Sequence, residues 1–353
     1  MRPAWAEVDL GAVAANVRTV RDLVAPAAVC AVVKADGYGH GSVEVARAAL
    51  DAGATWLAVA LPSEGRVLRD AGVDAPVLLL SEPLEWDEVL DCGLTPTVHS
   101  ERAVAALPAG TGVHLKVDTG MHRIGVRPEH AVARARQVLD AGLSLDAVWT
   151  HCPVADEPGN PFTDEQADRF DAVLADLAAA GIEPPLVHAA NSAAAIAHPR
   201  LRHGMVRLGI AMYGLAPMPV DVPLRPAMSL RARVTHVQRV AKGEAVSYGL
   251  RRPAPEDTIV ATVPIGYADG VTRRLSHVGG EVHVGGERRP FAGTITMDQL
   301  LVDCGPGSDV AVGDEVELIG AHVTADEWAA WLDTITYEVV CGISPRVPRA
   351  YRS

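Results

Sequence analysis

VCAVVKADGYGHG, residues 29–41, carries an apolar run into a glycine-rich turn and places Lys34 at the junction. Apolar neighbours such as Val32 and Val33 disfavour the charged ammonium form, so Lys34 is predicted to be a neutral nucleophile near pH 7, as a Schiff-base lysine must be. The turn leads into an amphipathic run at residues 42–52, where the N–H groups of a helix start would suit a phosphate. An arbitrary lysine at a strand end is more often a solvated surface residue, so the rest of the chain has to decide between the two interpretations.

Short apolar runs alternate with helix-like segments up to about residue 228, as expected of repeated β/α units. The predicted strands are residues 29–33, 56–60, 77–80, 95–98, 113–117, 146–150, 186–189 and 205–208. The predicted helices include residues 43–52, 63–71, 85–92, 129–141 and 163–180. Eight parallel strands with intervening helices in roughly 200 residues predict a TIM barrel, the (β/α)8 fold.

Beyond residue 228 the pattern changes to short β-rich runs separated by glycine, proline and charged turns. These runs are residues 228–240, 258–264, 281–284, 299–304 and 315–319, and residues 325–332 are predicted to be helical. The sequence therefore predicts a barrel domain at residues 1–228 and a mainly β domain at residues 229–353. The proline-punctuated residues 217–223 are the predicted linker.

Composition excludes several classes of partner. With 44 acidic against 31 basic residues the formal net charge is -13, and the absence of a basic block argues against nucleic acid. No apolar run approaches the ~20 residues of a membrane span and the N-terminal region lacks a signal-peptide core, so we expect a cytoplasmic protein without a membrane partner. The cysteines are odd in number, far apart and without CxxC spacing, which indicates reduced thiols. No HExxH or paired histidine spacing indicates a metal.

Polar residues follow the predicted barrel strands at their carboxyl ends, the face where barrel active sites form. They are Lys34, Ser81, Lys116, Asp118, His151, Asn191, Ser192 and Arg207. The loops after the last two strands of such barrels often hold a phosphate. A lysine, a phosphate site and a neighbouring arginine together suggest pyridoxal phosphate.

The chain resembles the alanine racemases over nearly its whole length, through nine short motifs in the same order. These are AVVKADGYGHG, HLKVDTGMHRIG, THCPVADE, HAANSAA, VRLGIAMYG, VSYG, PIGYADG, MDQ and RVPR. The resemblance implies a pyridoxal-phosphate enzyme that interconverts L-alanine and D-alanine and supplies D-alanine for peptidoglycan. It further implies that Lys34 holds the cofactor as a Schiff base and acts as one base, while Tyr248 is the base for the opposite face of the substrate. Two bases are needed because the α-proton leaves one face and returns to the other.

The remaining roles come from the same resemblance. His151 packs near the pyridine ring, and Arg207 faces the pyridine nitrogen; because arginine cannot accept a hydrogen bond, that nitrogen is the unprotonated acceptor. Arg123 lies near the substrate carboxylate, and Lys116 matches a lysine that is often carbamylated. The cofactor-binding set also includes Tyr38, Asn191, Ser192, Gly209 and Ile210. Tyr267, Met297 and Asp298 approach the substrate and, with Tyr248, come from the partner subunit of a homodimer.

Three residues depart from the motifs of the family and leave the substrate range open. Pro345 stands where some members have a tyrosine before RVPR, Cys152 replaces the phenylalanine of THF, and Leu208 replaces a proline. A racemase of broader specificity, acting on serine or larger amino acids, is therefore the alternative. Three other classes are less favoured. Arg207 argues against a pyridoxal-phosphate decarboxylase, and Tyr248 argues against a non-catalytic cofactor carrier. The GYGHG spacing argues against a dinucleotide oxidoreductase.

Overall fold

The computed structural model describes residues 3–219 and 221–353, which form two compact units. One unit contains Gly11–Gly37 and Gly41–Arg225. The other contains the residues up to Leu10, Tyr38–His40 and Pro226–Ser353. The predicted linker at residues 217–223 includes Val220, which lies outside the described residues. None of the helices in the described chain is both long and apolar enough to cross a membrane.

The first unit is built on an eight-stranded parallel sheet. Its strands are β2 (Ala28–Val32), β3 (Trp56–Val59), β4 (Val77–Leu79), β5 (Thr95–Val98), β6 (Gly112–Lys116), β7 (Ser144–Trp149), β8 (Leu186–His188) and β9 (Met205–Leu208). They are ordered β8-β7-β6-β5-β4-β3-β2-β9. Hydrogen bonds from Gly204 N to Val187 O (3.1 Å) and from Arg207 N to Ala190 O (2.9 Å) connect the two ends of this order and close the ring. The predicted barrel is confirmed, with every strand end within two residues of its predicted place.

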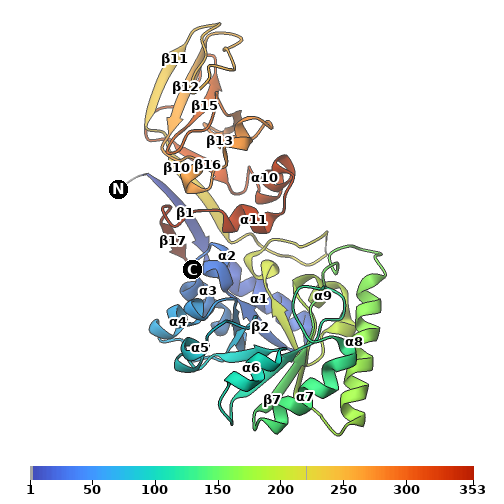
Figure 1. The fold of residues 1–353 in the computed structure, drawn as a ribbon. Coiled ribbons are helices and arrows are strands. Elements are labelled where there is room, and N and C mark those ends of the chain that lie inside the picture. The colour runs from blue at the N-terminus through green and yellow to red at the C-terminus, as the bar shows by residue number, and fades with distance from the viewer. Residues whose placement is uncertain (1–2, 220) are drawn as a thin grey trace. The chain divides into compact units, whose positions relative to one another are not determined.

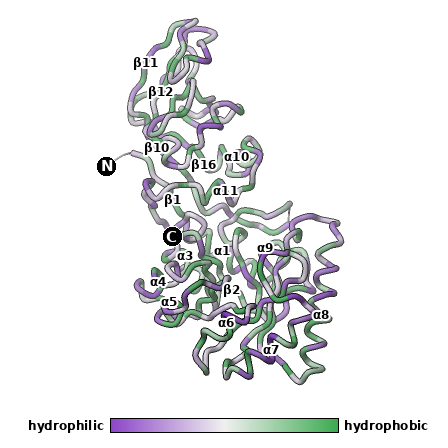
Figure 2. Tube along the Cα trace, viewed as in Figure 1, coloured by the Kyte–Doolittle hydropathy of each residue, from purple (hydrophilic) through white to green (hydrophobic). Residues whose placement is uncertain are grey.

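Helices surround these strands (Figure 1). They are α1 (Leu10–Val24), α3 (Ser42–Asp51), α4 (Pro62–Asp70), α5 (Asp87–Asp91), α6 (Glu101–Ala106), α7 (Ala131–Asp140), α8 (Phe162–Ala179) and α9 (Ser192–Ala197), with 3-10 turns η1 (Pro128–His130), η2 (Pro199–Leu201) and η3 (Ile210–Tyr213). All five helices named from the sequence are present. Hydrophilic and hydrophobic residues alternate along α8 (Figure 2), and its buried residues include Phe170, Val173 and Leu177. This spacing gives the helix one apolar face to pack on the barrel.

The second unit is mainly β, as predicted. A six-stranded sheet has the order β14-β13-β16-β10-β1-β17 and a three-stranded sheet the order β11-β12-β15. The strands are β1 (Ala4–Asp9), β10 (Met228–Arg233), β11 (His236–Val240), β12 (Thr258–Val263), β13 (Glu281–Val284), β14 (Glu287–Pro290), β15 (Leu300–Gly305), β16 (Glu315–Ile319) and β17 (Arg349–Arg352). The helices are α10 (Ala325–Leu332) and α11 (Thr336–Cys341), with turns η4 (Tyr267–Asp269) and η5 (Arg273–Ser276).

Two strands at opposite ends of the chain pair with each other in this unit. β1 pairs antiparallel with β10 and parallel with β17. The alternation in β1 buries Ala4, Ala6 and Val8, of which the two alanines give only a weak apolar signal. Neither strand was predicted, because the partner of each lies more than 200 residues away in the sequence and no local pattern shows the pairing.

Candidate active site

The chain turns with a left-handed backbone immediately after Lys34. α2 (Lys34–Tyr38) contains Ala35, Asp36 and Gly37 at φ values of 52°, 51° and 61°. Residues with a Cβ rarely adopt this conformation, since Cβ crowds the following carbonyl oxygen. The turn is held by hydrogen bonds from Gly37 N to Val33 O (2.9 Å) and from Ser42 N to Asp36 Oδ1 (2.9 Å). Lys34 therefore leaves the end of β2 from a strained and well-bonded segment, a type of backbone that is common at functional sites.

Two buried cations share one aromatic ring inside the barrel. Lys116 and Arg207 are each only 3% exposed, and neither forms an ion pair in the described part of the chain. The Trp149 ring lies 4.2 Å from Lys116 Nζ and 4.6 Å from Arg207 Cζ, measured to the ring centroid. The strand register brings these side chains together, because Trp149 is paired with Lys116 on one neighbouring strand and with His188 on the other. Cation–π attraction thus replaces the carboxylate that a buried cation usually requires.

Arg207 is oriented by four acceptors. Its NH1 group donates to His188 Nδ1 (2.7 Å), and its NH2 group donates to His151 Nδ1 (3.1 Å) and to two backbone carbonyl oxygens, those of residues 150 and 189 (both 2.8 Å). Because arginine only donates, both Nδ1 atoms must be unprotonated. Burial and the Arg207 charge lower the pKa of His188 and of His151 well below the usual range, so both rings are neutral. In the described chain the Arg207 Nε–H group has no partner, and it remains available to another acceptor.

The hydrogen bonds that start at Arg207 continue from His188 to His114. With Nδ1 of His188 unprotonated, its proton lies on Nε2, which donates to His114 Nδ1 at 3.1 Å. Burial, and then Arg207, lower the pKa of His114 to about 4. His114 Nε2 is buried without a partner among the described residues. Arg207 therefore fixes the tautomer of both rings, and the pair cannot reorient without breaking a bond to a buried charge.

Lys116 has an unusual charge state. Burial lowers the pKa of Lys116 to about 7, and the charges of Arg207 and Arg123 act in the same direction. Arg123 itself is exposed and makes no hydrogen bond or ion pair in the described chain. It lies in the loop between Val117 and Val126, two residues that form an isolated β-bridge. In this loop Asp118 Oδ1 accepts the N–H groups of Gly120 and His122 (both 3.0 Å). A substantial fraction of Lys116 is thus a neutral amine near pH 7.

The predicted phosphate residues meet at the ends of β8 and β9. Asn191 Oδ1 accepts Ala194 N (3.0 Å) at the start of α9. Ser192 Oγ accepts the N–H of Gly209 (2.9 Å) and of Ala211 (3.4 Å). Because both bonds use its oxygen as acceptor, the Ser192 hydroxyl keeps its own proton to donate to a ligand. Ile210 begins η3 next to this group.

Tyr38 belongs by its contacts to the second unit. Its ring is 8% exposed and its centroid lies 6.1 Å from that of Tyr337. Burial, and then the neighbouring Tyr337, raise the pKa of Tyr38, so its hydroxyl is neutral. It can therefore act as a hydrogen-bond donor.

The other second-unit residues gather around residues 293–299, after the hairpin that carries Tyr248. Ser247 Oγ donates to Thr294 O (2.5 Å), and Thr294 Oγ1 donates to Tyr248 O (3.2 Å). Tyr267 N donates to the carbonyl oxygen of residue 296 (3.0 Å), directly before Met297. The predicted set of Tyr248, Tyr267, Met297 and Asp298 is thus brought together within one unit. Asp298 is paired with Arg346 at 2.7 Å.

Three of these side chains are unusually exposed for their type. Tyr248 is 73% exposed, Met297 52% and Tyr267 43%. Exposed apolar side chains that cluster on a surface commonly mark a binding interface.

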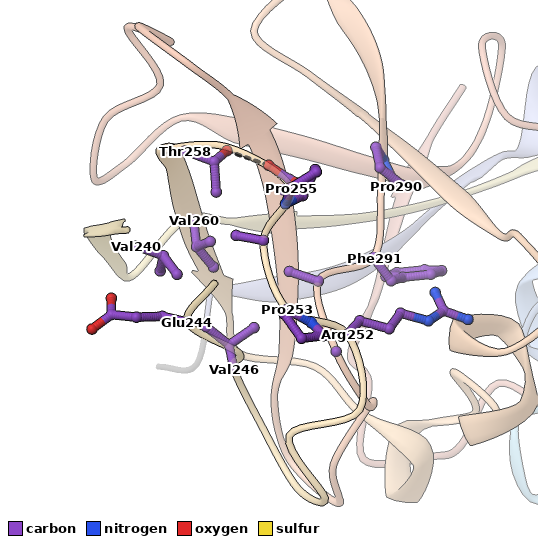
Figure 3. A pocket seen from close by; sticks show the side chains of 14 residues that line it. Val240, Glu244, Val246, Arg252, Pro253, Pro255, Thr258, Val260, Pro290 and Phe291 are labelled. Carbon is purple, nitrogen blue, oxygen red and sulfur yellow. Dashed lines mark hydrogen bonds between the residues drawn. The ribbon is translucent and has the colours of Figure 1, made fainter. Parts of the chain in front are cut away.

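A cavity of about 210 Å³ lies under the base of the Tyr248 hairpin (Figure 3). Its lining includes Val246 and Pro253 from the hairpin, and Val260 and Phe291 from the sheet side.

Sequence reasoning missed Trp149, His188 and His114. A signal was present, because His114 lies two residues before Lys116 and so faces the same side of its strand. His188 is the first residue of the HAANSAA motif and ends β8. Applying the two-residue period to each barrel strand would have placed all three rings in the interior.

Models of known protein families match both parts of the chain. The alanine racemase N-terminal domain matches residues 8–217 and the alanine racemase C-terminal domain matches residues 227–351. The alanine racemase of Symbiobacterium thermophilum is 46% identical, over 99% of this chain and 97% of the relative. The alanine racemase of Desulforamulus reducens is 45% identical, over 99% of each chain.

Solved structures agree with these matches. The alanine racemase of Streptomyces coelicolor has a TM-score of 0.91 and 40% identity, covering 99% of this chain and 98% of that one. The alanine racemase of Streptomyces lavendulae has a TM-score of 0.92 and 38% identity, covering 100% and 98%. The chain belongs to the alanine racemase family.

Proposed function

We propose that this protein interconverts L-alanine and D-alanine with pyridoxal phosphate, in a homodimer whose subunits share their active sites. Arg207 is the observation that carries the proposal. It is a buried, donor-only group whose NH1 and NH2 atoms are committed to the protein, while its Nε–H is available to a ring nitrogen. Such a partner keeps that nitrogen unprotonated, which limits electron withdrawal and suits return of the proton over decarboxylation or transamination.

The described side chains fit the cofactor of the family. Lys34 supplies the amine, Ser192 a hydroxyl proton, and Gly209 and Ile210 backbone N–H groups next to it. When bound, pyridoxal phosphate withdraws electrons from the substrate and makes its α-proton acidic. Asn191 positions α9, which begins at Ser192, and the Tyr38 hydroxyl is a further donor for the phosphate.

Two bases on opposite faces of the substrate carry the racemisation. Lys34 takes or returns the α-proton on one face, and Tyr248 of the partner subunit does so on the other. A tyrosine hydroxyl is a weak base at neutral pH, so it needs a positive environment. We assign that positive charge to Arg207; the neutral His151 ring accepts one of its N–H groups and orients it. The 73% exposure of Tyr248 in a single chain supports its use in a second subunit.

The substrate carboxylate is assigned to Arg123, with Tyr267, Met297 and Asp298 of the partner lining the approach. Carbamylation of Lys116 would replace a cation with an anion that orients Arg123 through paired hydrogen bonds. Its lowered pKa supports this assignment, because only the neutral amine adds carbon dioxide. In this proposal residues 1–228 hold the cofactor and residues 229–353 complete the partner's site. The D-alanine serves peptidoglycan synthesis in the cytoplasm.

Borohydride reduction followed by peptide mapping tests the cofactor assignment. The chain has three lysines, Lys34, Lys116 and Lys242, so the label can fall on few places. We expect it on Lys34, together with loss of the optical activity of L-alanine in the unreduced enzyme and no such loss in Lys34→Ala. A label on another lysine would overturn the assignment of Lys34 to the cofactor. Faster racemisation of serine than of alanine would overturn the assignment of alanine as the substrate.

Mixed dimers test the shared site. Lys34→Ala and Tyr248→Phe are each expected to be nearly inactive alone. If each site combines Lys34 of one chain with Tyr248 of the other, half of the reassociated dimers contain one intact site, and about a quarter of the wild-type activity returns. No recovery in a mixture shown to exchange subunits would place both bases in the same chain.

A further inference from the structure

Hydrogen bonds hold the strained turn beside Lys34 on both of its sides. Ala35 and Asp36 carry side chains and still adopt the left-handed region, with φ values of 52° and 51°. On the C-terminal side Asp36 is bonded, with its Oδ1 accepting Ser42 N (2.9 Å) and its carbonyl oxygen accepting Gly41 N (2.8 Å). On the N-terminal side, where Lys34 leaves the strand, Val33 O accepts Gly37 N (2.9 Å), and a second bond comes from a different β/α unit.

Glu64 on α4 supplies that anchor. Its Oε1 atom accepts the N–H of Ala35 at 2.7 Å. Its Oε2 atom accepts the N–H groups of Ala60 (2.8 Å) and Leu61 (3.1 Å), just before α4 begins. Glu64 forms no ion pair within the described chain, so backbone N–H groups are its partners. One carboxylate therefore connects the turn after Lys34 to the end of β3, through charge-assisted hydrogen bonds.

A second helix of the chain shows that capping does not require both oxygens. At the start of α10, Glu327 Oε2 accepts Thr324 N (2.8 Å), while Glu327 Oε1 pairs with Arg288 (2.7 Å). The helix start thus uses one oxygen and leaves the other for a surface cation. At α4 the corresponding oxygen reaches Ala35 instead. The bond to Ala35 is separable from the capping of α4.

We propose that Glu64 is a positioning residue for the racemase reaction: by holding the Ala35 N–H, it fixes the direction in which Lys34 projects from β2. The inference rests on the proposed function of Lys34. Glu64 touches the backbone next to Lys34 and not the reacting atoms, so it acts through Lys34. Releasing Ala35 would let the turn relax toward a conformation favoured by residues with a Cβ and would displace the amine.

Glu64→Gln separates the two roles of the carboxylate. Its single carbonyl oxygen can keep the two bonds to Ala60 and Leu61, but its NH2 group then faces another donor at Ala35. Loss of a charge-assisted bond predicts about 10- to 100-fold faster hydrogen exchange of the Ala35 amide, measured on the cofactor-loaded dimer. We expect kcat for alanine to fall about 10-fold with a smaller change in KM, because the substrate itself is not contacted.

Two further variants make the result decisive. Glu64→Asp is one methylene shorter and should lose Ala35 while still capping α4, and it should show the same exchange and kcat changes. Glu327→Gln is the matched control, with the same chemical change at a helix start in the second unit. It should leave both quantities unchanged.

Unchanged exchange at Ala35 in folded Glu64→Gln or Glu64→Asp would overturn the proposal. So would failure of both variants to fold, because a positioning role requires a fold that survives without this bond. Failure of the proposed function is recognised separately. In that case wild-type protein would not racemise alanine or label at Lys34, whatever the exchange at Ala35.

Discussion

Lys116→Met should stabilise the protein at neutral and lower pH. In the barrel, burial and then neighbouring cations lower the pKa of Lys116 from 10.5 to about 7. A change of this size corresponds to roughly 5 kcal/mol against the protonated folded state. The Trp149 ring lies 4.2 Å from Lys116 Nζ. Methionine keeps an apolar, polarisable stem beside the ring. The variant is therefore expected to gain up to about 5 kcal/mol in the free energy of unfolding.

The gain depends on pH in a defined direction. Below about pH 7 the lysine amine is protonated in both the folded and the unfolded chain, so the folded state bears the full cost. As pH rises from about 7 to 10.5, the folded amine is already neutral, and the cost disappears when the unfolded amine also loses its proton. The advantage of the variant should therefore shrink to near zero at the upper end of this range.

Urea unfolding of the two proteins at equal concentration, in buffers free of carbon dioxide, measures the difference. All other titrating groups are shared, so they cancel. Lys242→Met is the control, since it makes the same chemical change at an exposed lysine. A difference that does not vary with pH, or a variant less stable than wild type below pH 7, would refute the reasoning. Added bicarbonate should stabilise only the wild type if Lys116 is carbamylated.

Two other substitutions test the site. His188→Phe leaves a buried N–H of Arg207 without its acceptor and should lower the free energy of unfolding by about 3 kcal/mol. His114→Phe removes a hydrogen bond between two uncharged rings and should lower it by about half as much. Urea unfolding measures both changes. Gly266→Ala would place a Cβ 2.3 Å from Thr296 O and should displace the turn that carries Tyr267. Because we assign Tyr267 to the substrate approach, we expect kcat/KM for alanine to fall about 10-fold in a steady-state assay. Wild-type kinetics for this variant would mean that the turn does not shape the substrate site.

Much of the fold could be predicted because its signals are local. Central parallel strands are buried on both faces and read as short apolar runs, such as AVCAV in β2 and VLL in β4. Eight such runs with helices between them specify a barrel. β14 and the helices α1, α6, α9 and α11 were not named from the sequence, and β1 and β17 depend on a pairing between the two ends of the chain.

Some features of the candidate site could likewise be predicted from the sequence, and others could not. The places of Lys34 and Arg207 followed from the sequence, because barrel strands present polar residues at their carboxyl ends. The fixed tautomers of His188 and His114 did not, since they depend on hydrogen bonds between residues 19 and 74 positions apart. Nor did the lowered pKa of Lys116, which requires the depth of burial and the distance to Arg207.

By itself the sequence determined the order of the elements and the strand ends at which the candidate side chains lie, because hydrophobic period and chain direction are local properties. Only the tertiary structure decided which groups meet. It placed Lys116 and Arg207 within 4.6 Å of the centroid of the same Trp149 ring, paired the NH1 and NH2 donors of Arg207 with His188 and His151, and brought Glu64 from one β/α unit to the strained turn of another. The physical reason is that hydrogen bonds and charge interactions act over a few ångströms in space, and barrel closure makes distant residues neighbours at that scale.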